Sequence, residues 1–254
     1  METVAKAKSR LGRMVLLAGS TLSVLTIAAV IMLAVAVVTG FRARRFYSEV
    51  MAKWLSRAIL RMWGVRLEVH QDEPFPETQT VYVSNHSSTL DMFVLVALGL
   101  PNTRFVGAQD LSGFLRWMAP LGVFTVLMGT RWAPPPSRPV ERARWFAATE
   151  HILRRTGGSI YLSPEGERVT TGRLGRFNTD NFQLAANLAA PIVPLYIDIP
   201  CEIDPGTGFD ALPGTVHVRV QPAISTRGWT PKGLDANTGM VRDIFVRIHE
   251  ALRA

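Results

Sequence analysis

The hydrophobic and polar positions of this 254-residue chain follow one pattern up to about residue 63 and a different pattern after it. Residues 14–41 contain no charged side chain, and the apolar stretch 14–38 would be about 37 Å long as a helix, more than the roughly 30 Å of a bilayer's hydrocarbon core. Residues 46–63 place aromatic and aliphatic side chains at helical spacing, with Lys and Arg mostly on the opposite side. The pattern predicts a hydrophobic membrane helix followed by an amphipathic helix at the bilayer interface.

After residue 64 short apolar runs alternate with segments of helical periodicity, which predicts an α/β fold with a central mixed sheet flanked by helices. We therefore expect a membrane-anchoring segment, 1–63, and an α/β domain, 64–254. Strands are expected at residues 67–70, 80–84, 104–106, 123–128, 159–163, 192–197 and 215–221. Helices are expected at 91–98 and 111–118, between Ser137 and Gly157, and at 182–187 and 238–252, with a loop at 132–136.

The membrane topology of residues 14–38 has two open interpretations. A secretory signal would have a shorter apolar region, so we favour a segment that stays in the membrane. A single span with its C-terminal side in the cytoplasm fits the basic residues that follow it, and a re-entrant segment broken near Gly19 and Ser20 fits nearly as well. We expect the α/β domain on the cytoplasmic face of the cell inner membrane.

The charge distribution supports a lipid partner. The formal net charge is +8, but residues 1–66 carry 11 Lys and Arg against 2 Glu, so the whole basic excess lies beside the hydrophobic segment. A polybasic flank of this kind attracts anionic lipid. A nucleic-acid-binding protein would carry the excess on its folded domain, so nucleic acid is not expected as a partner. Cys201 is the single cysteine, which excludes an intrachain disulfide, and we expect it to be buried.

His86 and Asp91 form the candidate catalytic pair. An apolar, β-prone run delivers His86 to the end of a strand, and after a Ser/Thr-rich turn Asp91 opens an apolar helix. A carboxylate on one ring nitrogen fixes the imidazole tautomer and stabilises the imidazolium, so the other nitrogen can take a proton from an alcohol. The alternative is that Asp91 only favours the positive end of a helix dipole and that His86 is an ordinary loop residue.

Four short blocks follow one another along the chain, at residues 85–91, 127–131, 163–168 and 191–194. In this order they resemble the glycerolipid acyltransferase family typified by 1-acyl-glycerol-3-phosphate acyltransferase. Asn85, His86 and Asp91 meet its first block, N-H-x4-D. Its second block, an arginine after an apolar strand, is similar to residues 127–131, which end in Arg131.

The third block of the family, F-P-E-G-T-R, resembles residues 163–168. Glu165, Gly166 and Arg168 are present, whereas Ser163 replaces the Phe and Glu167 the Thr. Residues 191–194, Pro-Ile-Val-Pro, look like the fourth block. The resemblance covers roughly residues 65–222.

The resemblance implies an O-acyltransferase that needs no cofactor and uses acyl-CoA or acyl carrier protein as co-substrate. His86 would be the general base and Asp91 would orient it, without an acyl-enzyme. Asn85, Glu165 and Gly166 would shape the acceptor site, and Arg131 and Arg168 would bind an acidic head group, because guanidinium pairs bidentately with phosphate. The expected acceptor is lysophosphatidic acid, giving phosphatidic acid.

Departures from the family pattern bear on the acceptor. Ala108-Gln109-Asp110-Leu111 stands where a lysine-containing K-x-E-L is usual, and Asn178 stands where a lysine is common. Less positive charge favours a zwitterionic acceptor, so a lyso-aminolipid such as lyso-ornithine lipid is the alternative. Arg173 and Arg176 could restore the charge.

Other classes of function have less support. A serine hydrolase would need a G-x-S-x-G elbow, which the chain lacks, and a non-catalytic scaffold has no reason to retain His86, Asp91, Glu165 and Gly166 together. No metal site is expected, because the remaining histidines stand singly in the sequence. These are His70, His151, His217 and His249.

Overall fold

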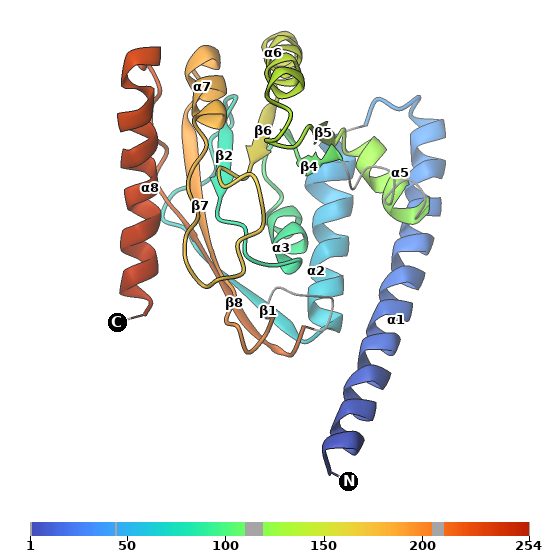
Figure 1. Cartoon of the computed structure of the whole chain (residues 1–254). Helices are drawn as coiled ribbons and strands as arrows, with labels where there is room; N and C mark the ends of the chain where they lie inside the picture. Colours follow the sequence, from blue (N-terminus) through green and yellow to red (C-terminus); the bar gives the residue numbers. More distant parts are fainter. Residues whose placement is uncertain (1, 44, 110–118, 205–210, 254) are drawn as a thin grey trace.

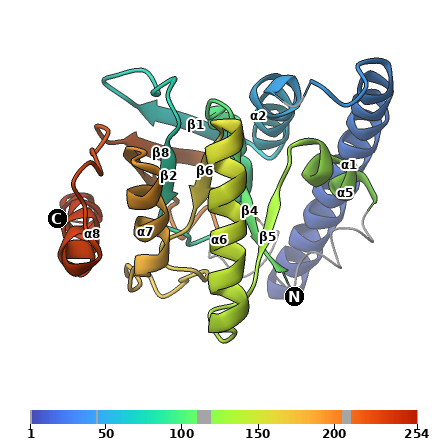
Figure 2. The ribbon, with the colours of Figure 1, turned by 90° about the horizontal axis from the view of Figure 1, so that it is seen from above.

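A six-stranded mixed sheet with helices on both faces forms the body of the protein (Figures 1 and 2). The computed structural model describes residues 2–43, 45–109, 119–204 and 211–253. The strand order is β1-β8-β7-β2-β6-β3. These strands are β1 (Val65–His70), β2 (Val81–Ser84), β3 (Thr103–Arg104), β6 (Ser159–Leu162), β7 (Ile192–Asp198) and β8 (Gly214–Val220). Two further strands, β4 (Val106–Ala108) and β5 (Arg131–Ala133), pair in parallel beside them.

Strand direction changes once across the sheet. β2 pairs in parallel with β6 and β7, and β6 in parallel with β3. β8 runs antiparallel to β7, and β1 then pairs in parallel with β8 at the edge. The predicted central mixed sheet flanked by helices is therefore confirmed.

Alternate residues of the central strands face two separate hydrophobic clusters. Val81 and Val83 of β2 belong to one cluster and Tyr82 to the other, as expected for the two-residue period of a strand buried on both faces. The helices of the first face are α6 (Pro139–Thr156), α7 (Thr179–Leu188) and α8 (Leu234–Ala251). Those of the second face are α1 (Glu2–Val38), α2 (Lys53–Met62), α3 (Leu90–Leu98) and α5 (Ala119–Leu127).

The N-terminal helices share a hydrophobic cluster with the sheet. α1 runs without interruption through Gly19 and Ser20, so the break that a re-entrant segment would need there is absent. Residues 12–38 are long and apolar enough to cross a membrane by length and composition. The amphipathic segment is a π-helical turn, Phe46–Ala52, that continues directly into α2. Trp63 after α2 donates its indole N–H to the Thr21 hydroxyl at 2.8 Å, which ties α2 to α1.

Two secondary-structure predictions around Arg131 are wrong. Residues 123–128, expected as a strand, lie in the helix α5 and the turn after it, and Gly129 ends that helix with a left-handed φ of 68°. A short apolar run fits a buried strand and a packed helix equally well, and packing against α1 decides for the helix. Arg131 therefore begins β5, which extends into the loop expected at 132–136, and does not end a strand.

Most other elements match their predicted ranges. The helix expected at 182–187 extends to Thr179–Leu188, and the one at 238–252 begins earlier, at Leu234. The strand expected at 104–106 is divided between β3 and β4. Cys201 is exposed, so its predicted burial is wrong. The helix expected at 111–118 lies outside the described residues.

Candidate active site

His86 and Asp91 lie side by side where the chain passes from β2 to α3. The Nδ1 atom of His86 is 2.9 Å from Oδ2 of Asp91. Because a carboxylate only accepts hydrogen bonds, this contact requires the proton on Nδ1 and leaves the lone pair on Nε2. The His86 side chain is 35% exposed and that of Asp91 only 1%, so the ring is open to a substrate while its carboxylate partner is shielded from water.

The backbone of the turn fixes the Asp91 carboxylate. Its Oδ2 atom also accepts the N–H groups of Ser87 at 2.7 Å and Ser88 at 2.9 Å. Asp91 lies in the first turn of α3, where a negative charge is favoured by the unpaired N–H groups of the helix. These hydrogen bonds hold the carboxylate in one orientation, and the carboxylate in turn orients the imidazole through Nδ1.

Ser88 adds a contact that the motif did not indicate. Its hydroxyl donates to Oδ2 of Asp204 and accepts the N–H of Leu90 at 2.8 Å. Both Ser88 and Asp204 are buried. The start of α3 is thus held from the segment after β7, more than 100 residues away, and only the folded chain reveals this partner.

Glu165 connects the loop after β6 to the backbone of His86. Its Oε2 accepts the His86 N–H and its Oε1 accepts the Gly175 N–H, both at 2.7 Å. Burial raises the pKa of Glu165 above its ordinary value, although these two N–H groups and the nearby His86 act to lower it. Both carboxylate oxygens accept backbone N–H groups of the protein, so Glu165 holds the backbone of His86 and that of Gly175 in fixed positions.

The loop that contains Glu165 also donates a hydrogen bond to the backbone carbonyl of His86. Val169 donates its N–H to the carbonyl of His86 at 2.8 Å, and Arg168 donates to the hydroxyl of Thr89 at 2.7 Å. Gly166 has a φ of 74°, and a Cβ there would lie 2.8 Å from Nδ2 of Asn178, so glycine is required at this turn. The first and third sequence blocks therefore meet in space.

Asn85 faces β7. Its amide nitrogen donates to the carbonyl of Ile197 and its amide oxygen accepts the N–H of Ile197, both at 2.8 Å. The side chain thus extends the pairing of β2 with β7 just before His86. A substrate contact of Asn85 stays a prediction.

The two predicted arginines lie in different places. Arg168 is exposed beside the His86 turn. Arg131 lies on β5, donates from Nε to the hydroxyl of Thr149 at 3.1 Å, and stacks over the Trp145 ring of α6. Burial and the neighbouring Arg104 lower the pKa of Arg131. Of the two arginines, Arg168 has a described contact with the His86 turn, and the contacts described for Arg131 are with Thr149 and Trp145. A head-group contact of Arg131 stays a prediction.

The expectation that the remaining histidines stand apart is wrong for two of them. His70 and His217 come together on β1 and β8, with ring centroids 5.5 Å apart. Their separation of 147 positions in the chain hid this contact. His249, in contrast, is paired with the Tyr196 hydroxyl at 2.7 Å, and His151 is exposed on α6.

A strand-end histidine held by a buried aspartate, with a partly exposed imidazole and an adjacent arginine, is the arrangement expected of an enzyme in which a histidine base activates a hydroxyl group. Residues 66–198 match the family model described as Acyltransferase, and the chain belongs to that family. The predicted family resemblance is confirmed.

Individual relatives carry a consistent description. The chain is 27% identical over 205 residues to the 1-acyl-sn-glycerol-3-phosphate acyltransferase of Pseudomonas aeruginosa, covering 79% of this chain and 76% of that protein. It is 30% identical over 192 residues to the alpha form of Mus musculus, covering 74% of this chain and 65% of that protein. It is 27% identical over 183 residues to the chloroplastic LPAT1 of Arabidopsis thaliana, covering 70% of this chain but only 48% of that protein.

A solved structure shares the fold. The crystal structure of the 1-acyl-sn-glycerophosphate acyltransferase PlsC from Thermotoga maritima superposes with a TM-score of 0.77 at 18% identity. The superposition covers 96% of this chain and 98% of that one, so the likeness includes the N-terminal helices.

Proposed function

We propose that this protein transfers a fatty acyl group from an acyl thioester to the free hydroxyl of 1-acyl-sn-glycerol-3-phosphate, giving phosphatidic acid. The observation that carries the proposal is the 2.9 Å contact between Nδ1 of His86 and Oδ2 of Asp91, which leaves Nε2 open as a base. The descriptions of the relatives support the choice of acceptor.

The reaction proceeds by direct attack of the acceptor hydroxyl on the thioester. His86 Nε2 removes the hydroxyl proton as the oxygen bonds to the carbonyl carbon, and Asp91 stabilises the resulting imidazolium. When the tetrahedral intermediate collapses, the carbon–sulfur bond breaks and the departing thiolate takes the proton back from His86. No side-chain nucleophile is needed, which agrees with a site whose central residues are His86, Asp91 and Glu165.

Arg168 is the residue that we propose to bind the phosphate of the acceptor. It is exposed, it touches Thr89 between His86 and Asp91, and guanidinium binds phosphate oxygens in pairs. A head group held there lies next to the catalytic turn. Arg168 would also bind the acidic group of a lyso-aminolipid. A lyso-aminolipid is therefore the acceptor with which lysophosphatidic acid must be compared.

The membrane contact of the protein follows from α1. Val30, Val37 and Val38 are 65%, 66% and 87% exposed on this helix, a large apolar surface for a protein in water. We propose that this surface lies in the inner membrane with the sheet on its cytoplasmic face, because the adjoining polybasic residues favour anionic lipid.

The experiment offers the purified full-length protein a panel of lysolipids with acyl-CoA and with acyl carrier protein as donors. We expect phosphatidic acid from lysophosphatidic acid, and loss of product by about 10² to 10⁴ in His86→Ala, the usual contribution of a general base. His151→Ala, at an exposed histidine on α6, is the matched control and should turn over normally. Turnover of His86→Ala at the normal rate would refute the mechanism, and acylation of only a lyso-aminolipid would refute the acceptor.

A further inference from the structure

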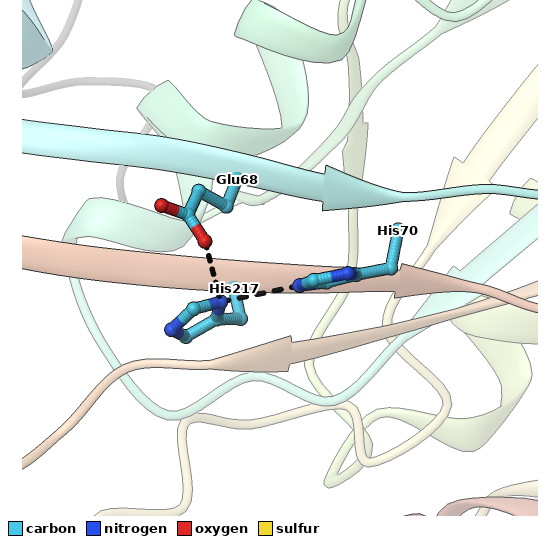
Figure 3. Close-up of side chains that lie close together, drawn as sticks. All are labelled: Glu68, His70 and His217. Atoms are coloured by element: carbon cyan, nitrogen blue, oxygen red, sulfur yellow. Dashed lines mark hydrogen bonds and ion pairs between the residues drawn. The ribbon is translucent and has the colours of Figure 1, made fainter.

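Three metal-ligand side chains project from the edge of the sheet, on β1 and β8. Glu68 and His217 are Cα partners in the parallel ladder, and His70 follows Glu68 by two residues on the same face of β1. Figure 3 shows the Glu68 carboxylate and the His70 ring converging on His217. Val216 and Val218, on either side of His217 in β8, are buried on the opposite face of the sheet. Their burial fixes the direction in which the three polar side chains point.

Two of the three separations between the ligand atoms are those of a tetrahedral metal site. Nδ1 of His217 lies 3.2 Å from Nε2 of His70 and 3.4 Å from Oε2 of Glu68. One oxygen or nitrogen from each of the three residues lies within 4.8 Å of the others. Ligands at about 2.0 to 2.2 Å from a tetrahedral Zn²⁺ are about 3.3 to 3.6 Å apart, so the two measured separations need little change on binding.

Hydrogen bonding alone satisfies this cluster poorly. The same nitrogen, Nδ1 of His217, faces both a carboxylate and a second imidazole nitrogen, and it carries at most one proton. If Nδ1 carries that proton, the proton is shared between two contacts; if Nδ1 accepts from His70 instead, its lone pair is used there and the Glu68 carboxylate receives no proton from it. A cation between the three groups would use one lone pair from each of them.

We propose that Glu68, His70 and His217 form a binding site for one zinc ion. Two imidazole nitrogens and one carboxylate oxygen suit zinc and exclude the oxygen-rich shell that calcium or magnesium requires. The side chains of His217 and Glu68 are 35% and 44% exposed, so a water molecule can take the fourth position.

The ion joins the outermost strand to the rest of the sheet. Among the described strands β1 has one neighbour, β8, and the site takes two ligands from β1 and one from β8. The charged neighbours of the site along the ladders are Asp198 of β7, which lies in register with His217, and Arg219 of β8, which lies in register with His70. β7 separates the site from β2 and His86, so zinc stabilises the sheet edge and takes no part in acyl transfer.

The experiment uses the full-length, tag-free protein in detergent, stripped with a chelator and then titrated with zinc against a chromophoric competitor. We expect one ion per chain, and a rise in the thermal-unfolding midpoint as zinc is added. His217→Ala and Glu68→Gln should each weaken binding by more than the roughly 10- to 100-fold that loss of an outer-shell partner costs. His151→Ala, at an exposed histidine on α6, is the matched control and should bind normally.

Cobalt supplies a second readout that does not depend on stability. Bound in place of zinc, it should give the intense visible absorption of a tetrahedral ion in the wild type and lose it in His217→Ala. Circular dichroism and acyl transfer should be the same in both proteins, which separates loss of the ion from misfolding. Failure to bind one zinc ion per chain, or unchanged binding in His217→Ala, would overturn the proposal while leaving the acyltransferase assignment intact.

Discussion

In the proposed mechanism the imidazole of His86 accepts and returns one proton in each turnover, and its surroundings hold the ring in the tautomer that allows this. Oδ2 of Asp91 accepts three hydrogen bonds, from the His86 ring and from two backbone N–H groups. Those two N–H groups would hold the carboxylate in place even if the ring moved. Asp91 therefore sets the direction of His86 and stabilises its charged form.

Asp91→Asn should reduce kcat/KM for acyl transfer by roughly 10² to 10⁴, because an amide stabilises the imidazolium less and permits the wrong tautomer. The fold should persist, since the amide oxygen can still accept the N–H groups of Ser87 and Ser88. Steady-state kinetics of the purified variant measure the change. Asp243→Asn, at an exposed acid on α8, is the control, and an Asp91→Asn enzyme within a few-fold of wild type would contradict the role of Asp91.

At this scale the sequence revealed the pair but not all of its supports. The spacing of His86 and Asp91 and the block around Glu165 predicted a site that the structure brings together. The bond from Ser88 to Asp204 joins residues 116 positions apart and follows no motif, so the folded chain was needed to show it. The position expected for Arg131 at the end of a strand was wrong, because that strand is a helix, while its contact with a head group stays a prediction.

At the scale of elements, packing between distant segments determines whether an apolar run becomes a strand or a helix. Residues 123–128 have an apolar composition that either a strand or a helix can bury, and α1 supplies the surface on which a helix packs. The strands that hold the site have stronger local signals, because both faces are buried and turn residues bound each run. The sequence therefore predicted β2, β6 and β7 well and failed between β4 and β5.

The contact of α8 with β7 includes a histidine whose charge opposes folding. Burial and the nearby Arg253 lower the pKa of His249, while its Nδ1 contacts the Tyr196 hydroxyl at 2.7 Å. The unfolded chain binds a proton at about pH 6.5, more readily than the folded protein does. Folding stability from this group is therefore present above that pH and is lost as the pH falls through the window below it.

We expect the thermal-unfolding midpoint of the wild type to fall more steeply than that of His249→Gln as the pH is lowered from 7 to 5. Glutamine keeps an acceptor for the Tyr196 hydroxyl and does not ionise. His151→Gln, at an exposed histidine, should follow the wild type. Equal slopes for His249→Gln and the wild type would show that His249 does not titrate with folding.

At the scale of the whole molecule, the N-terminal helices are both a membrane surface and part of the fold. Met32 and Ala36 of α1 and Ile59 and Leu60 of α2 are buried in the same cluster as β7 and β8. A protein shortened to begin near Gly64 would lose these contacts. Membrane attachment is therefore better tested by changing the exposed side of α1 in the full-length protein.

Replacing Ile27, Val30 and Val37 by Asn should weaken binding to anionic vesicles by roughly 100-fold or more, because each side chain contributes about 1.5 to 3 kcal/mol when buried in an apolar phase. These residues are 63%, 65% and 66% exposed, so the fold should tolerate the changes. Flotation with vesicles measures the binding. Val140→Asn on α6, where the side chain is 64% exposed, is the control, and a triple variant that still floats fully would contradict the assignment of this face.

If the proposed function is correct, the unbroken length of α1 also governs how the enzyme meets its acceptor. A protein held in a lipid sheet by such a helix searches for lysolipid by lateral diffusion in two dimensions. Its rate then follows the mole fraction of acceptor among the surrounding lipids rather than its amount per volume of solution. Adding inert phospholipid to a vesicle would slow the reaction, whereas diluting the whole suspension with buffer would leave the turnover of each molecule unchanged.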